Sequence, residues 1–111
     1  MTYSILFTVR REYYDAIVVG TKTIEVRKAT PRWLTVLNQA NYRRTEDHEP
    51  AVAVFMCGKG RIHRRYVTNV SSAESASAAL GREPSKQGRE DLGDGRVVVF
   101  HLGQAVQGGV K

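Results

Sequence analysis

The chain has 111 residues, of which 41% are hydrophobic and 25% are charged, which suits one globular domain and leaves too little length for two. No apolar run reaches the roughly 18 to 20 residues of a membrane span, no basic segment precedes a long apolar stretch, and Cys57 is the only cysteine. We therefore expect a cytoplasmic protein with no membrane partner and no thiolate metal site, and its net charge of +6 favours an acidic partner.

The first 20 residues predict a strand followed by a short helix. Residues 4–9 are apolar and β-branched enough for a buried strand, which the basic pair Arg10 and Arg11 ends. From residue 12 to residue 19 the apolar side chains fall three to four apart, as on one face of a helix. Gly20 stands where helices often end in a left-handed residue.

A half-buried strand is predicted over residues 23–28, because polar and apolar residues alternate there. Ile24 and Val26 fall on one side, and Glu25 and Arg27 fall on the other. Since the apolar pair must be buried, we expect Ile24 and Val26 to point into the core and Glu25 and Arg27 to point outward.

Thr30 and Pro31 predict the start of a second short helix, since threonine caps free amides and proline suits a first helical turn. The apolar side chains expected to face inward are Trp33, Leu34 and Leu37. Residues 38–50 are polar and charged, and we expect a loop there. Strand character returns over residues 51–56.

Residues 58–60 read Gly-Lys-Gly and predict the turn of a hairpin. Its second strand is expected over residues 61–70, where alternate side chains form an apolar and a basic set. The apolar set is Ile62, Tyr66 and Val70, and the basic set is Arg61, His63 and Arg65.

The last third of the chain predicts a helix over residues 71–80 that stops near Gly81, then a polar connection with helical content at 86–92, then a strand over 96–102. About five or six strands with two or three short helices indicate an α+β, β-rich fold, a small closed or nearly closed β-barrel. The domain is expected over residues 1–105, and residues 106–111 are expected to fray.

The segment from Gly20 to Arg27 has the pattern G-x-K-x-x-E-x-R, with Lys22 and Glu25 at its central fixed positions. This pattern resembles the signature of ASCH domains, which belong to the PUA-like barrel superfamily. A strand with a basic end and a short helix precede the pattern here, as they do in that family. The resemblance is specific over residues 5–28 and looser over most of the chain. It implies a PUA-like barrel that binds RNA, or a small hydrolase.

The motif residues suit a binding cleft on physical grounds too. Lys22 lies at a strand entrance, where a flexible cation can reach across the mouth of a barrel. Glu25 and Arg27 share one face, about 6 to 7 Å apart at the backbone. A carboxylate there can accept hydrogen bonds from a base edge or a ribose hydroxyl, while the cations hold phosphate. The alternative is an exposed ion pair of little energetic consequence.

The resemblance leaves catalysis open. Some ASCH members hydrolyse the amide of acetylated cytidine nucleosides, using the motif lysine, a threonine at the position of Glu25, and a later glutamate. Lys22 matches that pattern, but Glu25 removes the hydroxyl, so we rank this amidohydrolase second. No local motif identifies the later glutamate among Glu74, Glu83 and Glu90. A ribonuclease, also implied by the family, would need a general base such as Glu25 or His63.

Basic residues gather in the first two thirds of the chain. Residues 1–70 hold 12 Lys and Arg against 6 Asp and Glu, whereas residues 71–111 hold 5 of each sign. Most of the cations are arginines, which grip phosphate with paired hydrogen bonds and stack on bases. We expect RNA or a nucleotide-like small molecule as partner, held by Lys22, Glu25 and Arg27. The expected outer electrostatic rim is Arg10, Arg11, Lys59, Arg61 and Arg65.

The basic charge and the histidine spacing lead to two further expectations. A protein-interaction adaptor with a basic surface is a third function, because charge alone does not separate acidic proteins from phosphates. No cofactor and no metal site are expected, because the three histidines, His48, His63 and His101, lack metal-ligand spacing.

Overall fold

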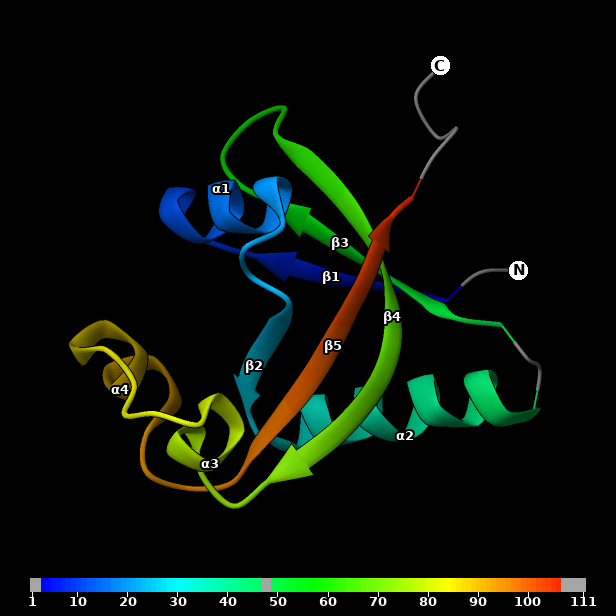
Figure 1. Ribbon diagram of the computed structural model, residues 1–111. Helices are drawn as coiled ribbons and strands as arrows, with labels where there is room; N and C mark the ends of the chain where they lie inside the picture. Colours follow the sequence, from blue (N-terminus) through cyan, green and yellow to red (C-terminus); the bar gives the residue numbers. More distant parts are fainter. Residues whose placement is uncertain (1–2, 47–48, 107–111) are drawn as a thin grey trace.

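The computed structural model describes residues 3–46 and 49–106, which form one five-stranded sheet with helices packed on it (Figure 1). The elements in chain order are β1 (Ser4–Thr8), α1 (Arg11–Val19), β2 (Ile24–Lys28), α2 (Pro31–Glu46), β3 (Ala51–Met56), β4 (Ile62–Ala73), α3 (Ala76–Leu80), α4 (Lys86–Leu92) and β5 (Val97–Ala105). The strand order is β1-β3-β4-β5-β2, with β1 and β3 parallel and the other neighbouring pairs antiparallel. The expected α+β class with five strands is confirmed, although four helices, not two or three, occur in these ranges.

The sheet curls into a half barrel along its two long strands, β4 and β5 (Figure 1). Register shifts between Arg65 and Asn69 interrupt the ladder that joins these strands, and such irregularities bend and twist a strand. The curl brings the two edge strands together, since Nη2 of Arg27 on β2 donates a hydrogen bond of 3.2 Å to the carbonyl oxygen of Thr8 on β1. The expected small barrel is therefore confirmed, with its open side between β1 and β2.

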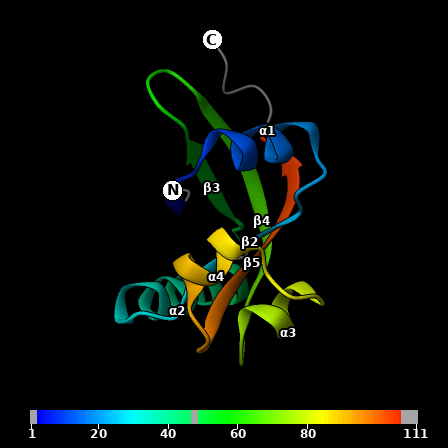
Figure 2. The same cartoon turned by 90° about the vertical axis from the view of Figure 1, so that its left-hand side faces the viewer.

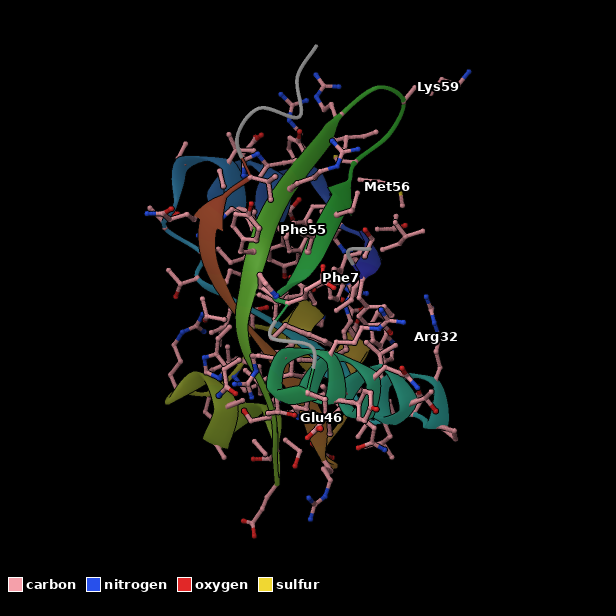
Figure 3. The ribbon with its side chains drawn as sticks, turned by 90° about the vertical axis from the view of Figure 1, so that its right-hand side faces the viewer. Phe7, Arg32, Glu46, Phe55, Met56 and Lys59 are labelled. Atoms are coloured by element: carbon pink, nitrogen blue, oxygen red, sulfur yellow. The ribbon has the colours of Figure 1, made fainter. Side chains whose placement is uncertain are left out.

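The main core fills the inner face of the sheet under α1 and α2. Phe7 lies at its centre, with ring centroids 5.3 Å from Trp33, 5.2 Å from Phe55 and 5.1 Å from Phe100. Figure 3 shows Phe7 and Phe55 inside the curl. Burying each such side chain stabilises the fold by about 1.5 to 3 kcal/mol, so this cluster fixes β1, α2, β3 and β5 relative to one another.

A smaller core covers the opposite face of β2 and β5, under α3 and α4. Val26, Val97 and Val99 pack there against Ala76, with Ile24 partly buried beside them. The expectation that Ile24 and Val26 pack in a core is therefore correct. The matching expectation that Glu25 and Arg27 point outward is wrong, because their face points into the curl, where Glu25 is only 6% exposed.

Residues 38–46, expected as a loop, continue α2 to Glu46. The helix begins as predicted, and Trp33 donates its backbone N–H to Oγ1 of Thr30 at 3.4 Å. Trp33 faces inward, but Leu34 is 37% exposed. The polar second half is held by packing, because Ala40 is buried in the main core and Asn41 donates a hydrogen bond to the carbonyl oxygen of Val70. Tertiary contacts thus override a weak local pattern.

Residues 71–73, expected in a helix, extend β4 instead, because they pair with Val97 to Val99 of β5. The helix that follows is short and begins after Ser75, whose side chain accepts a hydrogen bond from the backbone N–H of Ala78. It ends at Gly81 with φ of 71°, as predicted. The helical content expected over residues 86–92 is present as α4.

At the start of the expected tail, Val106 donates its backbone N–H to the carbonyl oxygen of Arg64 at 3.0 Å. The remainder of that tail, residues 107–111, lies outside the described residues. Within the described ranges, no helix is long and apolar enough to cross a membrane.

Candidate functional site

A cleft of about 700 Å³ opens beside β2, on the open side of the half barrel. Its walls come from the end of β1, from α1, β2 and the start of α2, and from the segment that holds α3 and α4. Figure 2 views the molecule from this side, with α4 in front of β2 and α1 above it. The charged side chains that line the cleft are Arg10, Lys22, Glu25, Arg27, Lys28, Arg82 and Asp91.

The turn after α1 delivers Lys22 to the cleft. Gly20 ends α1 with φ of 91°, a left-handed conformation that strains other residues. Its backbone N–H bonds to the carbonyl oxygens of Ala16 and Ile17, and the backbone N–H of Lys22 donates to Ala16 at 3.1 Å. The first two fixed positions of the motif therefore work together, because the glycine makes the turn that places the lysine.

Glu25 forms the floor of the cleft between two cations. Its Oε2 accepts a hydrogen bond of 3.0 Å from Nε of Arg27 and lies 2.9 Å from Nη2 of the same side chain. Its Oε1 lies 3.5 Å from Nζ of Lys22 and has no hydrogen-bond donor among the described residues. The side chain is only 7% exposed. Oε1 is thus a buried acceptor beside Lys22 that is left without a hydrogen-bond donor among the described residues.

Arg27 is held rigidly above the aromatic core. Its guanidinium lies 5.1 Å from the ring centroid of Phe7 and 5.6 Å from that of Trp33. Together with the bonds to Glu25 and Thr8, these cation–π contacts restrain the side chain from several directions. The Glu25–Arg27 pair is therefore preorganised before any ligand arrives.

The mouth of the cleft is bordered on one side by an ion pair between Arg10, the residue that precedes α1, and Asp91 of α4. Nη2 of Arg10 lies 3.5 Å from Oδ1 of Asp91, and both side chains are about half exposed. Surface pairs of this kind contribute about 0 to 1 kcal/mol, so Arg10 can exchange Asp91 for an anionic ligand at little cost. With five cations against two carboxylates, the cleft as a whole attracts anions.

The structure brings together four of the residues selected from the sequence: Lys22, Glu25, Arg27 and Arg10. Arg11 is adjacent in sequence but does not line the cleft, and it pairs with Asp15 at 3.1 Å. Lys59 lies on the loop between β3 and β4, at the opposite end of the molecule from α2 (Figure 3). Like Arg61, it does not line the cleft.

Arg65 was expected on the outer electrostatic rim, and this expectation is wrong. The residue is only 9% exposed and lies buried beneath α1. Its Nη1 donates a hydrogen bond of 2.9 Å to the carbonyl oxygen of Ile17, and its Nε donates to that of Gly103. On β4 the apolar Ile62 and Tyr66 are exposed instead. Arg65 is buried because α1 covers its side of β4. The register shifts that follow it bring Val70 to the buried side, which separates Val70 from Ile62 and Tyr66.

His63, the candidate general base, does not line the cleft. Burial lowers the pKa of its imidazole, and the nearby positive charge of Arg65 lowers that pKa further. Its Nε2 is buried without a hydrogen-bond partner among the described residues. Across those same residues, no group of three or more potential metal-ligating side chains occurs.

Sequence-based reasoning missed Tyr13, Arg82 and Asp91 as cleft residues. Tyr13 falls within the helix predicted over residues 12–19, and its ring centroid lies 5.6 Å from Nζ of Lys22. Arg82 and Asp91 belong to the polar segment between β4 and β5. No local pattern marks them, because only the packing of α3 and α4 beside β2 brings them to the cleft.

No model of a protein family matches the sequence, and no curated protein matches it significantly. Solved structures of the ASCH protein of Zymomonas mobilis do match. The crystal structure titled ASCH is 18% identical and has a TM-score of 0.58, with 92% of this chain and 69% of that chain covered. A serine-to-alanine mutant (19% identity, TM-score 0.60, 94% and 71% covered) and a tyrosine-to-phenylalanine mutant (19%, 0.59, 94% and 73%) match similarly. Likeness at this identity establishes a shared fold.

Proposed function

Because the chain has the ASCH fold, a PUA-like half barrel, we propose that its cleft binds a nucleoside unit of RNA or a modified nucleoside. The observation that carries this proposal is the carboxylate of Glu25 on the cleft floor, held between Lys22 and Arg27, whose buried Oε1 has no hydrogen-bond donor among the described residues. Base edges and ribose hydroxyls present the N–H and O–H donors that such an oxygen accepts.

The cations around Glu25 suit the phosphates of such a ligand. Arg10 and Arg82 reach the cleft from different elements than Lys22 and Arg27, so anionic groups can be met from several directions. Phosphate contacts position a nucleic acid without reading its sequence, whereas contacts to the base edge discriminate. We therefore assign discrimination to Glu25 and positioning to the cations.

Trp33 provides a direct test, because it is the only tryptophan and its ring lines the cleft. The 5′-monophosphates of cytidine, N4-acetylcytidine, uridine and adenosine are titrated into the protein at low salt while tryptophan fluorescence is recorded. We expect binding of at least one of them. Hydrogen bonds to charged groups contribute about 1.5 to 3 kcal/mol, so Glu25→Gln should weaken the preferred ligand about tenfold or more. Glu74→Gln, an exposed glutamate outside the cleft, is the matched control.

Lys22→Ala should weaken phosphate-bearing ligands, with Lys59→Ala as its matched control outside the cleft. Circular dichroism melts of each variant separate lost binding from lost folding. Absence of binding to all four ligands would contradict the proposal and leave the basic adaptor as the better explanation. Equal affinities of Glu25→Gln and Glu74→Gln would remove Glu25 from the site.

The amidohydrolase keeps second place because Lys22, the motif lysine, lies 3.5 Å from a carboxylate in the cleft. One observation is against it. Glu25 is the only glutamate of the described residues that lines the cleft, so none of them provides the later glutamate that the amidohydrolase pattern requires. The N4-acetylcytidine samples are therefore also analysed for cytidine. Turnover that disappears in Lys22→Ala would place the hydrolase first.

A further inference from the structure

A second hollow of about 360 Å³ adjoins the cleft, between the end of α1 and the residues that follow α3. Four residues line both hollows: Tyr13, Lys22, Leu80 and Arg82. These shared side chains therefore stand between the two spaces. Both volumes fall within the range of about 300 to 1,000 Å³ that ligand pockets occupy.

Two of the four shared residues, Lys22 and Arg82, are cations, and each lines both hollows. Among the described residues, Lys22 has one carboxylate neighbour, Glu25, which lines the larger cleft. Arg82 is exposed and donates a hydrogen bond to the carbonyl oxygen of Glu83, and it has no ion pair among the described residues. An anionic group placed between the two hollows would thus meet two cations, one of them unpaired in the described structure.

The second hollow differs from the cleft in chemistry. Its remaining lining includes the hydroxyl side chains Thr21 and Thr23 and the apolar Ile24, and it contains no carboxylate. Tyr13, shared between the hollows, is partly exposed and is the one aromatic residue among those that line the second hollow, with Nζ of Lys22 5.6 Å from its ring centroid. Stacking on aromatic rings accepts any base, since every base has a π-face. This hollow therefore suits a nucleoside that is held without being discriminated.

We infer that the two hollows are adjacent subsites of one groove, which binds a dinucleotide step of single-stranded RNA. Lys22 and Arg82 hold the linking phosphodiester, Glu25 reads the nucleoside in the larger cleft, and the next nucleoside occupies the hollow beside Tyr13. This inference rests on the proposed function and narrows its ligand class from a free nucleoside to an oligonucleotide.

The test compares the methyl ester of cytidine 3′-monophosphate with the dinucleoside monophosphate CpC, by calorimetry on the full chain at low salt. Both ligands are phosphodiesters with a single negative charge, so the comparison isolates the second nucleoside. We expect CpC to bind about tenfold more tightly or better, the effect of one stacked base. Thr23→Phe, at an exposed position that lines only the second hollow, should reduce the ratio of the two affinities to about one.

Thr35→Phe is the matched control, because Thr35 is exposed on α2 and lines neither hollow. It should keep the CpC advantage. If Thr23→Phe does not fold, Thr21→Phe replaces it, since Thr21 also lines only the second hollow.

The outcomes separate the two proposals. Binding of the methyl ester without an advantage for CpC would overturn the second subsite and leave the proposed function standing. A CpC advantage that persists in Thr23→Phe would overturn the placement of the second nucleoside. Binding of neither ligand would contradict the proposed function, and the dinucleotide groove with it.

Discussion

Arg27 and Arg65 are both strand arginines that point to the inner face of the sheet, yet they occupy different regions. Arg27 lines the cleft, pairs with Glu25 and lies against Phe7. Arg65 is buried beneath α1, where it donates to the backbone carbonyls of Ile17 and Gly103. The guanidinium of Arg27 is bound mainly by another side chain, and that of Arg65 by backbone from two other elements.

The two arginines show that an inward guanidinium has one of two roles in this fold, depending on what accepts its hydrogen bonds. A guanidinium whose donors satisfy backbone carbonyls joins elements together, and Arg65 joins α1 to the inner face of β4 and to β5. A guanidinium paired with a carboxylate at a cleft wall can exchange or share its partner with a ligand. Under the proposed function, Arg65 is therefore structural and Arg27 contributes to the ligand site, a difference that net charge does not reveal.

Of the substitutions that test the two roles, Arg65→Met should change stability most, because it keeps an apolar side chain and removes both hydrogen bonds. Leaving buried carbonyl oxygens without their charged donor should lower the free energy of unfolding by about 2 to 3 kcal/mol. Urea denaturation measures this change. Arg61→Met, at an exposed position, should stay within about 0.5 kcal/mol of the wild type.

Nucleotide affinity supplies the other half of that comparison. Arg65→Met should bind the preferred nucleoside as the wild type does, because Arg65 does not line the cleft. A variant of normal stability that has lost affinity would reverse the assignment and return Arg65 to the binding surface.

A smaller effect concerns the salt dependence of binding to single-stranded RNA. With about three to five phosphate contacts, log affinity should fall against log salt with a slope of roughly −2 to −3.5. Arg10→Ala should make this slope shallower by about 0.7, because one contact at the cleft mouth is lost. Arg61→Ala should leave the slope unchanged, since Arg61 lies outside the cleft.

Titrations at three salt concentrations measure these slopes. Equal flattening by Arg10→Ala and Arg61→Ala would show that RNA follows the hairpin between β3 and β4 as well as the cleft. The outer rim expected from the sequence would then extend beyond the open side of the half barrel.

The smallest effect is expected from His63, the neighbour of Arg65. Its folded-state pKa lies below the ordinary value of 6.5, through burial first and the charge of Arg65 second. Well above pH 6.5 the imidazole is neutral in both states and contributes no pH dependence. As the pH falls below that value, the unfolded chain takes up the proton first, so stability declines. His63→Gln should remove this part of the decline.

Urea unfolding at several pH values between neutrality and mild acid checks this expectation, with His101→Gln as a second histidine variant. Since His63 is only partly buried, the effect should be small beside that of Arg65→Met. A steeper decline in His63→Gln than in the wild type would contradict the direction of the shift.

The sequence was sufficient to predict that the five strands exist, that the chain turns at Gly20, and that the motif residues line one cleft, although β4 runs three residues further than predicted. Those features depend on neighbours within a few positions: alternation along a strand, a glycine after a helix, and a lysine, a glutamate and an arginine at fixed spacing. The structure places Lys22, Glu25 and Arg27 on one cleft, as the motif requires. Local physics is enough in these cases, because each residue acts on the backbone or the face that its own segment presents.

Tertiary structure decided which face is inside and which distant residues join the site. The inner position of Glu25 follows from the curl of the sheet, and that of Arg65 from α1, which covers its side of β4. Arg82 and Asp91 reach the cleft only because α3 and α4 pack beside β2. Alternation tells which side chains share a face, but what covers that face depends on pairing register and on elements many residues away.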